Sequence, residues 1–212
     1  MTDITIIGTG NMGSAIAKRA AAAGRSLQIL DRTPEKAAQL AGELGSGIIT
    51  GGLAEPALGD IVVLALYYGP AQEVVTRLRG SLTGKTVVDI SNPIDVETFD
   101  SLVVGPDTSA AEELAKLAPE ARFVKAFNTT FAGPLSEGSV DGKPLDVFIA
   151  SDSEEARKQV ADFVSAAGLR PLEVGALRHA RELEGFQLLL MALQANPAYE
   201  SFNWGTGLKI LD

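Results

Sequence analysis

The chain has 212 residues, of which 46% are hydrophobic and 21% charged, with no cysteine, one histidine and a net charge of −9. This is ordinary globular composition, sufficient to bury one large domain or one domain with a small appendage. It excludes disulfides, cysteine nucleophiles and thiolate or histidine-rich metal sites. The acidic balance also disfavours nucleic acid and anionic membranes as partners, because both require a basic surface.

The first 32 residues predict a strand, a glycine turn, a helix and a second strand. The run Ile4–Ile7 is short and β-branched, as in a buried strand. Gly8-Thr9-Gly10-Asn11-Met12-Gly13 follows, with the spacing G-x-G-x-x-G. The alanine-rich residues 14–24 predict a helix that ends at a glycine. Residues 27–30 predict the next strand, which leads into Asp31, 18 residues after Gly13.

This spacing has a chemical explanation in dinucleotide-binding proteins. Gly8 allows a sharp turn out of the strand, Gly10 leaves room for a pyrophosphate, and Gly13 lets the helix pack close to the sheet. The N–H groups of the first helical turn, at the positive end of the helix dipole, then bind phosphate. We therefore predict a dinucleotide site here; the alternative is a tight strand–helix turn without a ligand.

The same alternation continues along the chain. It predicts helices over 34–44, 71–79, 110–117, 155–167 and 177–194, and strands over 48–50, 61–66, 86–90, 122–127, 145–150 and 169–174. Segments 51–59, 94–106 and 131–144 carry glycines or prolines and predict irregular connections. The pattern indicates an α/β fold, a Rossmann-type, doubly wound and mainly parallel sheet covered on both faces.

We expect two parts, an NAD(P)-binding domain over 1–174 and a C-terminal helix with an aromatic tail over 175–212. The tail carries Tyr199, Phe202 and Trp204, so it is expected to pack on the body or on another subunit. The first strand begins almost at Met1, which leaves no room for a secretory leader. No apolar run approaches the about 20 residues that span a bilayer. A cytoplasmic protein is expected.

Three strand ends carry polar or aromatic residues: Tyr67-Tyr68-Gly69-Pro70, Ser91-Asn92-Pro93 and Ala126-Phe127-Asn128-Thr129-Thr130. In a parallel sheet they should open toward the same crevice as the glycine turn. Structural roles stay open: Asn92 as a turn former, the two tyrosines as a cover of the core, and residues 128–130 as a helix N-cap.

The last predicted helix carries several charged residues, and none of them is assigned to catalysis. His179 is expected at the surface or an interface. Glu182 and Glu184 are expected to be solvated or paired with Arg178 and Arg181. Dehydrogenases of alcohols need a proton donor, whereas hydride transfer between two rings needs chiefly face-to-face placement at about 3–3.5 Å. The predicted crevice favours the second reaction.

The chain resembles the NADPH-dependent coenzyme F420 reductase family, whose members are F420H2:NADP oxidoreductases, and a branch of small dinucleotide-binding oxidoreductases with a KAFNTTF stretch. The motifs are the GTGNMG opening, VVDISNP, VKAFNTT, the G-x-L-x-x-A-R-x-L-E segment from Gly175 to Glu184, and the closing GTGLKIL. The resemblance implies an NADP-binding Rossmann domain, a homodimer, no metal, and hydride exchange between NADP(H) and the deazaflavin F420.

The resemblance also implies site residues. It places Gly8–Met12 around the pyrophosphate, Asp31–Thr33 around the 2′-phosphate, and Tyr67, Asn92 and Asn128 around the nicotinamide and second ring. The predicted cofactor-binding residues are Gly8, Thr9, Gly10, Asn11, Met12, Gly13, Asp31, Arg32, Thr33, Leu66, Tyr67, Tyr68, Asn92, Pro93 and Asn128.

Asp31 departs from the family, which usually has Ser or Thr there. A carboxylate at this position accepts hydrogen bonds from an unmodified ribose and repels a 2′-phosphate, whereas Arg32 attracts one. NADP is favoured by the resemblance and by Arg32, and NAD is the alternative. Pyrroline-carboxylate reductases share the opening motif, but their longer helical C-terminal half is absent here.

Two other functions stay open at this point. One is an NAD(P)-dependent reductase of a small carbonyl, imine or flavin; reduction of a carbonyl or imine would need Tyr67, Tyr68 or His179 as proton donor. The other is a non-catalytic dinucleotide-binding redox sensor, in which the residues at the strand ends would only form turns.

Overall fold

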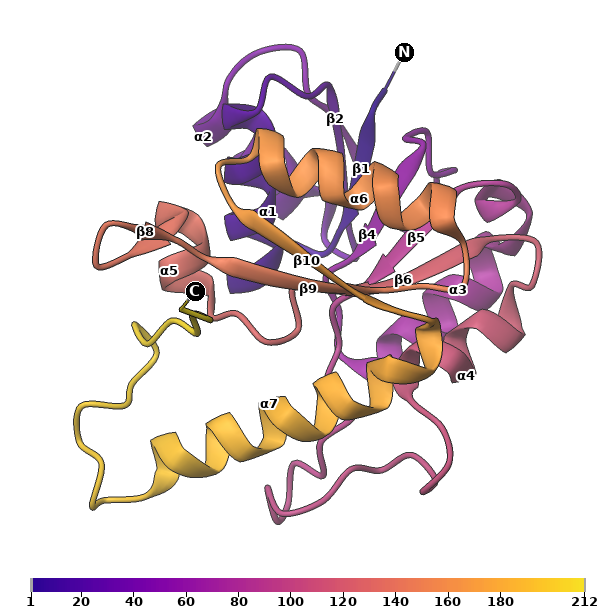
Figure 1. Ribbon diagram of the computed structural model, residues 1–212. Coiled ribbons are helices and arrows are strands. Elements are labelled where there is room, and N and C mark those ends of the chain that lie inside the picture. The colour runs from indigo at the N-terminus through magenta and orange to yellow at the C-terminus, as the bar shows by residue number, and fades with distance from the viewer. Residues whose placement is uncertain (1, 212) are drawn as a thin grey trace.

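The computed structural model describes residues 2–211 and is built on one eight-stranded sheet in the order β10-β9-β6-β5-β4-β1-β2-β3 (Figure 1). The strands are β1 (Ile4–Ile7), β2 (Leu27–Asp31), β3 (Ile49–Gly52), β4 (Ile61–Leu64), β5 (Thr86–Asp89), β6 (Arg122–Ala126), β9 (Asp146–Ala150) and β10 (Arg170–Gly175). A separate hairpin joins β7 (Ser139–Val140) to β8 (Lys143–Pro144).

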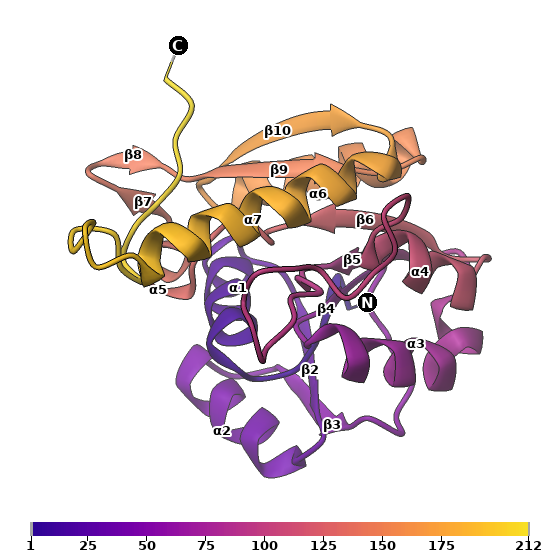
Figure 2. The same ribbon diagram turned by 90° about the horizontal axis from the view of Figure 1, so that it is seen from below.

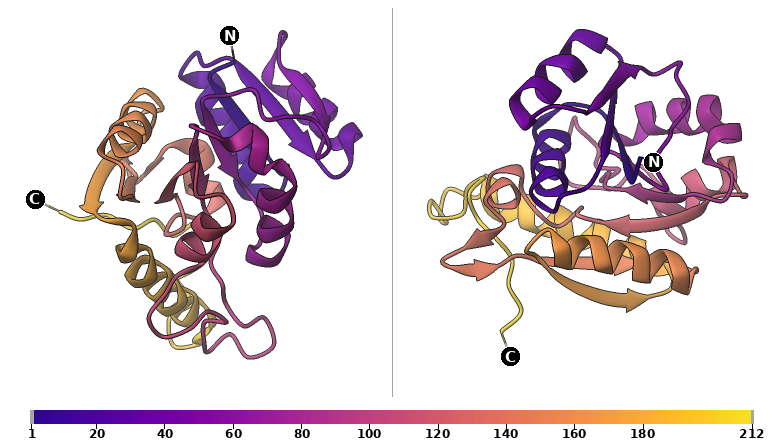
Figure 3. Two further views of the ribbon diagram at one scale, coloured as in Figure 1. Left: turned by 90° about the vertical axis from the view of Figure 1, so that its right-hand side faces the viewer. Right: turned by 90° about the horizontal axis from the view of Figure 1, so that it is seen from above.

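Helices cover both faces of this sheet, as the side and top views show (Figure 3). One apolar core contains residues of α1 (Asn11–Ala22), α2 (Pro34–Leu44), α5 (Ala132–Glu137) and α6 (Glu154–Ala166). The opposite core contains residues of α3 (Tyr68–Leu82), α4 (Ala110–Leu117), the short 3₁₀ turn η1 (Leu177–His179) and the start of α7 (Ala180–Ala195). The central strands are mostly apolar because both of their faces are buried.

The strand directions bring the predicted site residues to one edge. Strands β2, β1, β4, β5 and β6 are neighbours and run parallel, while β6 pairs with β9 antiparallel and β9 pairs with β10 parallel. The carboxyl ends of β1, β4, β5 and β6 therefore meet at one side, here called the carboxyl edge. The chain crosses from β3 back to β4, so the strand order switches between β1 and β4, where ligands bind in such sheets.

The predicted mainly parallel, Rossmann-type fold is confirmed, and several element boundaries were wrong. Helices α1 and α3 begin three residues earlier than predicted, and the connection 131–144 contains α5 and the β7–β8 hairpin. Pro70, predicted to precede its helix, and Pro134, predicted to lie in an irregular connection, are the third residues of α3 and α5. In the first turn of a helix a missing N–H costs nothing. Gly51 and Gly52, predicted as loop, pair with β2.

Helix α7 crosses beneath the carboxyl edge, and the chain after it turns back toward α5 (Figure 2). The ring of Trp204 packs edge-on against Phe131, with centroids 5.5 Å apart. Farther along, Lys209 Nζ and the Ile210 N–H each bond to the buried Asp146 carboxylate at 2.7 Å. These contacts tie the tail to β9. Within residues 2–211 no helix combines the length and apolar character needed to cross a membrane.

Candidate functional site

The glycine turn after β1 contains two glycines that packing requires and one that it does not. Gly8 has φ +104°, and a Cβ there would lie 2.4 Å from the Ala65 carbonyl oxygen after β4. A Cβ on Gly13 would lie 2.0 Å from the Gly8 carbonyl oxygen. Gly10 is exposed, and no atom lies within 4 Å of the position of its Cβ. Space at Gly10 is thus free for a ligand, as expected for the pyrophosphate position.

Helix α1 begins directly at this turn, and its positive end is available. Gly10 is the N-cap and provides no side-chain cap, and the first turn, all within the described chain, holds no acidic residue. Asn11 is exposed, and Met12 is half-buried against the α1 core. The first N–H groups of a helix have no partner inside it, so they can bind an anion.

Asp31, at the end of β2, is directed at the glycine turn. Its Oδ2 accepts hydrogen bonds from the N–H and hydroxyl of Thr9 at 2.9 and 2.8 Å, and its Oδ1 accepts one from the Thr33 N–H at 2.8 Å. Burial alone would raise the pKa of Asp31, but these bonds and the charge of Lys36 bring the pKa below its ordinary value. The carboxylate therefore ties the turn to β2, and Arg32 beside it is exposed.

The exit of β4 contributes one residue close to the glycine turn. A side-chain carbon of Leu66 lies 3.1 Å from the position of a Cβ on Gly8. Tyr67 is 82% exposed, which excludes the alternative in which it covers the core. Tyr68 is half-buried at the start of α3 and accepts a hydrogen bond from Gln72. Burial raises the pKa of the Tyr68 phenol, and the carboxylates of Glu113, Glu184 and Asp89 add to this.

Asn92 and Asn128, here called the amide pair, join the exits of β5 and β6. The Nδ2 group of Asn92 donates to the Asn128 carbonyl at 3.0 Å, and the Nδ2 group of Asn128 donates to Asn92 Oδ1 at 2.9 Å. Asn128 Nδ2 also donates to the Leu183 carbonyl of α7 at 3.0 Å. Phe127, a bulky residue at the unusual φ of +62°, makes the turn that places Asn128. The alternative in which residues 128–130 form a helix N-cap is excluded, because Phe131 occupies that position.

Pro93 is buried beside the amide pair and starts the segment that leads to α4. Its carbonyl accepts from the Val103 N–H at 2.7 Å, and Ile94 and Leu102 form a bridge. Arg181 of α7 holds the end of this segment through the carbonyls of Gly105 and Thr108, at 2.7 and 3.0 Å. The segment is thus fixed at both ends against the carboxyl edge.

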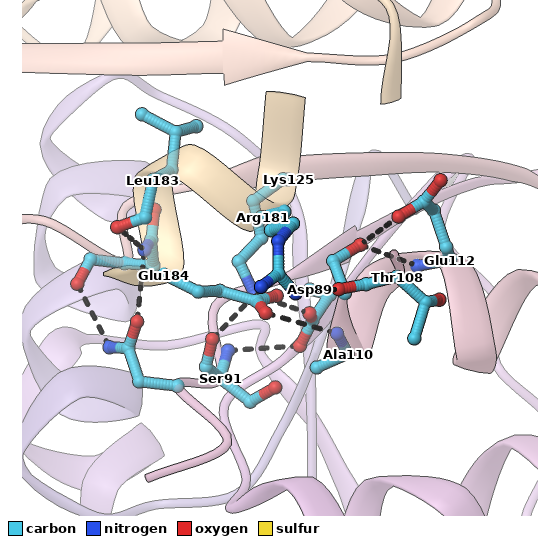
Figure 4. A network of polar contacts seen from close by, with 12 residues as sticks. Asp89, Ser91, Thr108, Ala110, Glu112, Lys125, Arg181, Leu183 and Glu184 are labelled. Carbon is cyan, nitrogen blue, oxygen red and sulfur yellow. Dashed lines mark hydrogen bonds and ion pairs between the residues drawn. The ribbon is translucent and has the colours of Figure 1, made fainter. Parts of the chain in front are cut away.

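A buried cluster of charges lies at the ends of β5 and β6, and the sequence did not predict it (Figure 4). Lys125 of β6 has no exposed surface, and its Nζ lies 2.7 Å from Asp89 Oδ2 and 2.7 Å from Glu184 Oε1. The same ammonium donates to the Ser91 carbonyl. We call Asp89, Lys125 and Glu184 the charged cluster. Glu184 Oε2 also accepts from the Ala110 N–H, at the start of α4.

The predicted solvated or arginine-paired state of Glu184 was therefore wrong, whereas Glu182 is exposed and pairs with His179 at 3.4 Å. Burial raises the pKa of Glu184, and Lys125 offsets only part of this rise. For Lys125 burial acts to lower the pKa, but Asp89 and Glu184 outweigh it and raise the pKa. The lysine is charged. A lone lysine within the apolar strand FVKAF was the signal that could have indicated a buried partner.

Comparison with known proteins identifies the family. Residues 3–93 match the family described as "NADP oxidoreductase coenzyme F420-dependent". The chain is 32% identical to the F420-dependent NADP reductase of Methanothermobacter thermautotrophicus, over 88% of this chain and 86% of that protein. The chain belongs to this family. The resemblance that the motifs indicated is thereby confirmed.

Two further similarities bear on fold and length. A solved structure from Arthrobacter sp. FB24 shares the fold, with a TM-score of 0.86 and 24% identity over the whole of both chains. The chain is also 32% identical to metalloreductase STEAP3 of Rattus norvegicus over 89% of its own length. It spans 37% of that relative, so the activity of the whole relative does not extend to it directly.

Proposed function

We propose that this enzyme transfers a hydride between NADP(H) and the deazaflavin coenzyme F420. The observation that carries the proposal is that the glycine turn, with its free Gly10 side, and the amide pair lie at the same carboxyl edge. The pyrophosphate would lie on the N-terminus of α1, and the nicotinamide would extend toward the exits of β4, β5 and β6. The family relationship supports F420 as the second ring.

Hydride exchange between rings fits the chemistry of this edge better than carbonyl reduction. Lys125 is enclosed by two carboxylates and a carbonyl, and burial raises the pKa of Tyr68, so neither group readily releases a proton to a substrate near neutral pH. Orientation of two rings requires positioned amides and backbone groups instead. The protein then supplies binding and orientation, while the two cofactors supply the redox chemistry.

NADP is the proposed dinucleotide, with NAD as the alternative. Asp31 directs both of its oxygens to Thr9 and Thr33, which reduces its availability to a ribose hydroxyl. Arg32 is exposed next to it, and the positive charge of Lys36 acts on the same carboxylate. Two cations beside this position favour a 2′-phosphate.

A flavin is the second candidate acceptor, and the metalloreductase relatives favour it. Reduction of a metal ion proceeds in single-electron steps, which a flavin can supply after it has taken a hydride. Small carbonyl or imine substrates and a non-catalytic sensor remain as outcomes of the test below.

A homodimer is proposed on the resemblance and on the surface of α7. Leu189 is 64% exposed, and Leu190, Met191 and Leu193 are only partly covered. A helix that is apolar on most sides is normally buried, so a second copy would cover it. Sedimentation velocity should give twice the monomer mass, and Leu189→Glu should shift the measured mass toward that of the monomer.

The cytoplasmic location stays a prediction.

The deciding experiment combines calorimetry with anaerobic single-turnover kinetics. NADP should bind more tightly than NAD, and NADPH should reduce F420 rapidly in the presence of the enzyme. Flavin mononucleotide and a panel of carbonyl compounds and imines are the comparison acceptors. Faster reduction of any of these would replace F420 by that acceptor, and dinucleotide binding without turnover of any acceptor would favour a sensor.

A further inference from the structure

The charged cluster lies on the side of the sheet covered by α3 and α4, and Asp89 and Lys125 each precede a member of the amide pair by three residues. Asp89 and Lys125 are paired in register on β5 and β6. Val87 and Phe123, two residues earlier on each strand, belong to the α3–α4 core, so strand alternation places Asp89 and Lys125 on the same face. Glu184 reaches this point from α7 (Figure 4).

The cluster is connected to both members of the amide pair by short paths. On the β5 side, Lys125 bonds to the Ser91 carbonyl and Asp89 accepts from the Ser91 N–H at 2.9 Å, immediately before Asn92. On the α7 side, the ion pair to Glu184 fixes the helix next to Leu183, whose carbonyl accepts from Asn128 Nδ2. One ammonium group therefore holds the supports of both amides.

The orientation of the Asn128 amide depends strongly on the second path. Asn128 is 2% exposed, and its Oδ1 has no hydrogen-bond partner among the described residues. The two bonds made by its Nδ2, to Asn92 and to Leu183, therefore define how the amide is turned. A displacement of α7 at Leu183 would remove one of the two.

We propose that the charged cluster is a positioning device that orients the amide pair for the nicotinamide end of the bound dinucleotide, an inference that rests on the proposed function. Asp89, Lys125 and Glu184 are positioning residues, because their buried charged groups form ion pairs with one another and hydrogen bonds with backbone groups. Stability alone does not explain them, since apolar residues of similar volume often replace a buried ion pair without loss. Directional bonds do fix the register of α7 on the sheet.

The first test measures the Asn128 side-chain amide without any ligand. Glu184→Gln preserves the size of the side chain and removes its charge, and Glu182→Gln makes the same change two residues away on an exposed carboxylate. The NMR signals of the Asn128 amide, identified by their loss in Asn128→Ala, should shift or broaden in Glu184→Gln and stay unchanged in Glu182→Gln. An unchanged Asn128 signal in Glu184→Gln overturns the proposal.

The second test separates the two ends of the dinucleotide by calorimetry. NADP carries the nicotinamide, and adenosine 2′,5′-bisphosphate lacks it. Glu184→Gln should weaken NADP about fivefold, the equivalent of one hydrogen bond, and leave the bisphosphate unchanged. In the Asn128→Ala background the same substitution should have no further effect, because the coupled residue is already absent.

These outcomes distinguish this proposal from the proposed function. Equal weakening of both ligands, or the same fivefold loss in the Asn128→Ala background, would show a general structural role and overturn the positioning role. If the unsubstituted protein binds neither ligand, the proposed function fails, while the amide signals still decide whether the cluster orients Asn128. Glu184→Asp, which retains the charge but shortens the side chain, replaces Glu184→Gln in both tests if the latter does not fold.

Discussion

Two regions of the carboxyl edge are built in opposite ways. The glycine turn is local and mainly a matter of steric fit: Gly8, Gly13 and Asp31 lie within one strand–helix–strand unit. The charged cluster instead joins β5, β6, α4 and α7, and Glu184 lies 74 residues from its partner Ala110. The first region resembles a preformed binding surface, and the second a set of supports assembled only when the whole chain has folded. Substitutions should therefore affect binding in one region and assembly in the other.

The largest expected effect is that of Lys125→Met. Removal of the cation leaves two buried carboxylates without compensation, so the free energy of unfolding should fall by about 3–5 kcal/mol at neutral pH. Burial already raises the pKa of Glu184, and without Lys125 the rise is no longer offset. An acid with a raised folded pKa binds protons more readily in the native state, so the deficit should shrink as the pH falls.

Urea unfolding at a series of pH values measures this effect. Lys158→Met is the matched control, because that lysine pairs with Asp162 on the surface, where ion pairs contribute at most about 1 kcal/mol. If the Lys125→Met protein is as stable as the control at neutral pH, the charged cluster does not support the assembly of the fold, and the contrast with the glycine turn is wrong.

The next effect sharpens the contrast within the glycine turn itself. In Gly13→Ala the new methyl group would meet the Gly8 carbonyl, so we expect a loss of about 3 kcal/mol in stability. Gly10→Ala meets no protein atom and should change stability by less than about 1 kcal/mol. Its NADP affinity should nevertheless fall at least tenfold, since the methyl group would occupy the pyrophosphate position. Thermal unfolding and calorimetry on both variants separate the structural glycine from the ligand-facing one.

Asp31→Ser tests the link between the turn and β2. Loss of the bonds to Thr9 and Thr33 should lower stability by about 1–3 kcal/mol at neutral pH. Because the folded pKa of Asp31 is depressed, this contribution is complete above the ordinary value of about 3.9 and disappears as the pH falls through the folded pKa. The variant and the parent should then converge in acid.

The same variant reports on cofactor choice. Removal of the carboxylate should shift the ratio of NADP to NAD affinity toward NADP by about 1–3 kcal/mol. Calorimetry with both dinucleotides gives the ratio independently of any change in stability. An unchanged ratio would mean that Asp31 acts only as a support of the turn.

A smaller effect on stability than that of Asp31→Ser is expected for Asn128→Ala. Its two side-chain hydrogen bonds contribute about 1–2 kcal/mol to the free energy of unfolding. Hydride transfer should fall by a larger factor, about a hundredfold, because the amide orients the reacting ring. Stopped-flow kinetics and urea unfolding on the same preparation compare the two. Equal losses in both would return Asn128 to a structural role.

The sequence allowed prediction of what depends on local spacing. The apolar runs of β1 and β4 and the glycine turn follow from neighbouring residues, and α4 was predicted to the residue. Helix α5 was missed because Gly133 and Pro134 were taken as signs of an irregular connection although they occupy a first helical turn. The β7–β8 hairpin, which turns at Asp141 and Gly142, was missed because its strands have only two residues each. Glu184 was misread because its partners come from distant elements, whereas Arg181 lies only three residues before it on α7.

One consequence of the Glu184 contact concerns recombination between relatives. A C-terminal segment grafted from another family member would place its own residue at the position of Glu184. That residue would then face Asp89, Lys125 and the Ala110 N–H group of α4. A donor without an acidic side chain there would leave the ammonium half-neutralised in the interior. We therefore expect that a graft of the C-terminal segment can transfer acceptor specificity only when β5 and β6 are taken from the same donor.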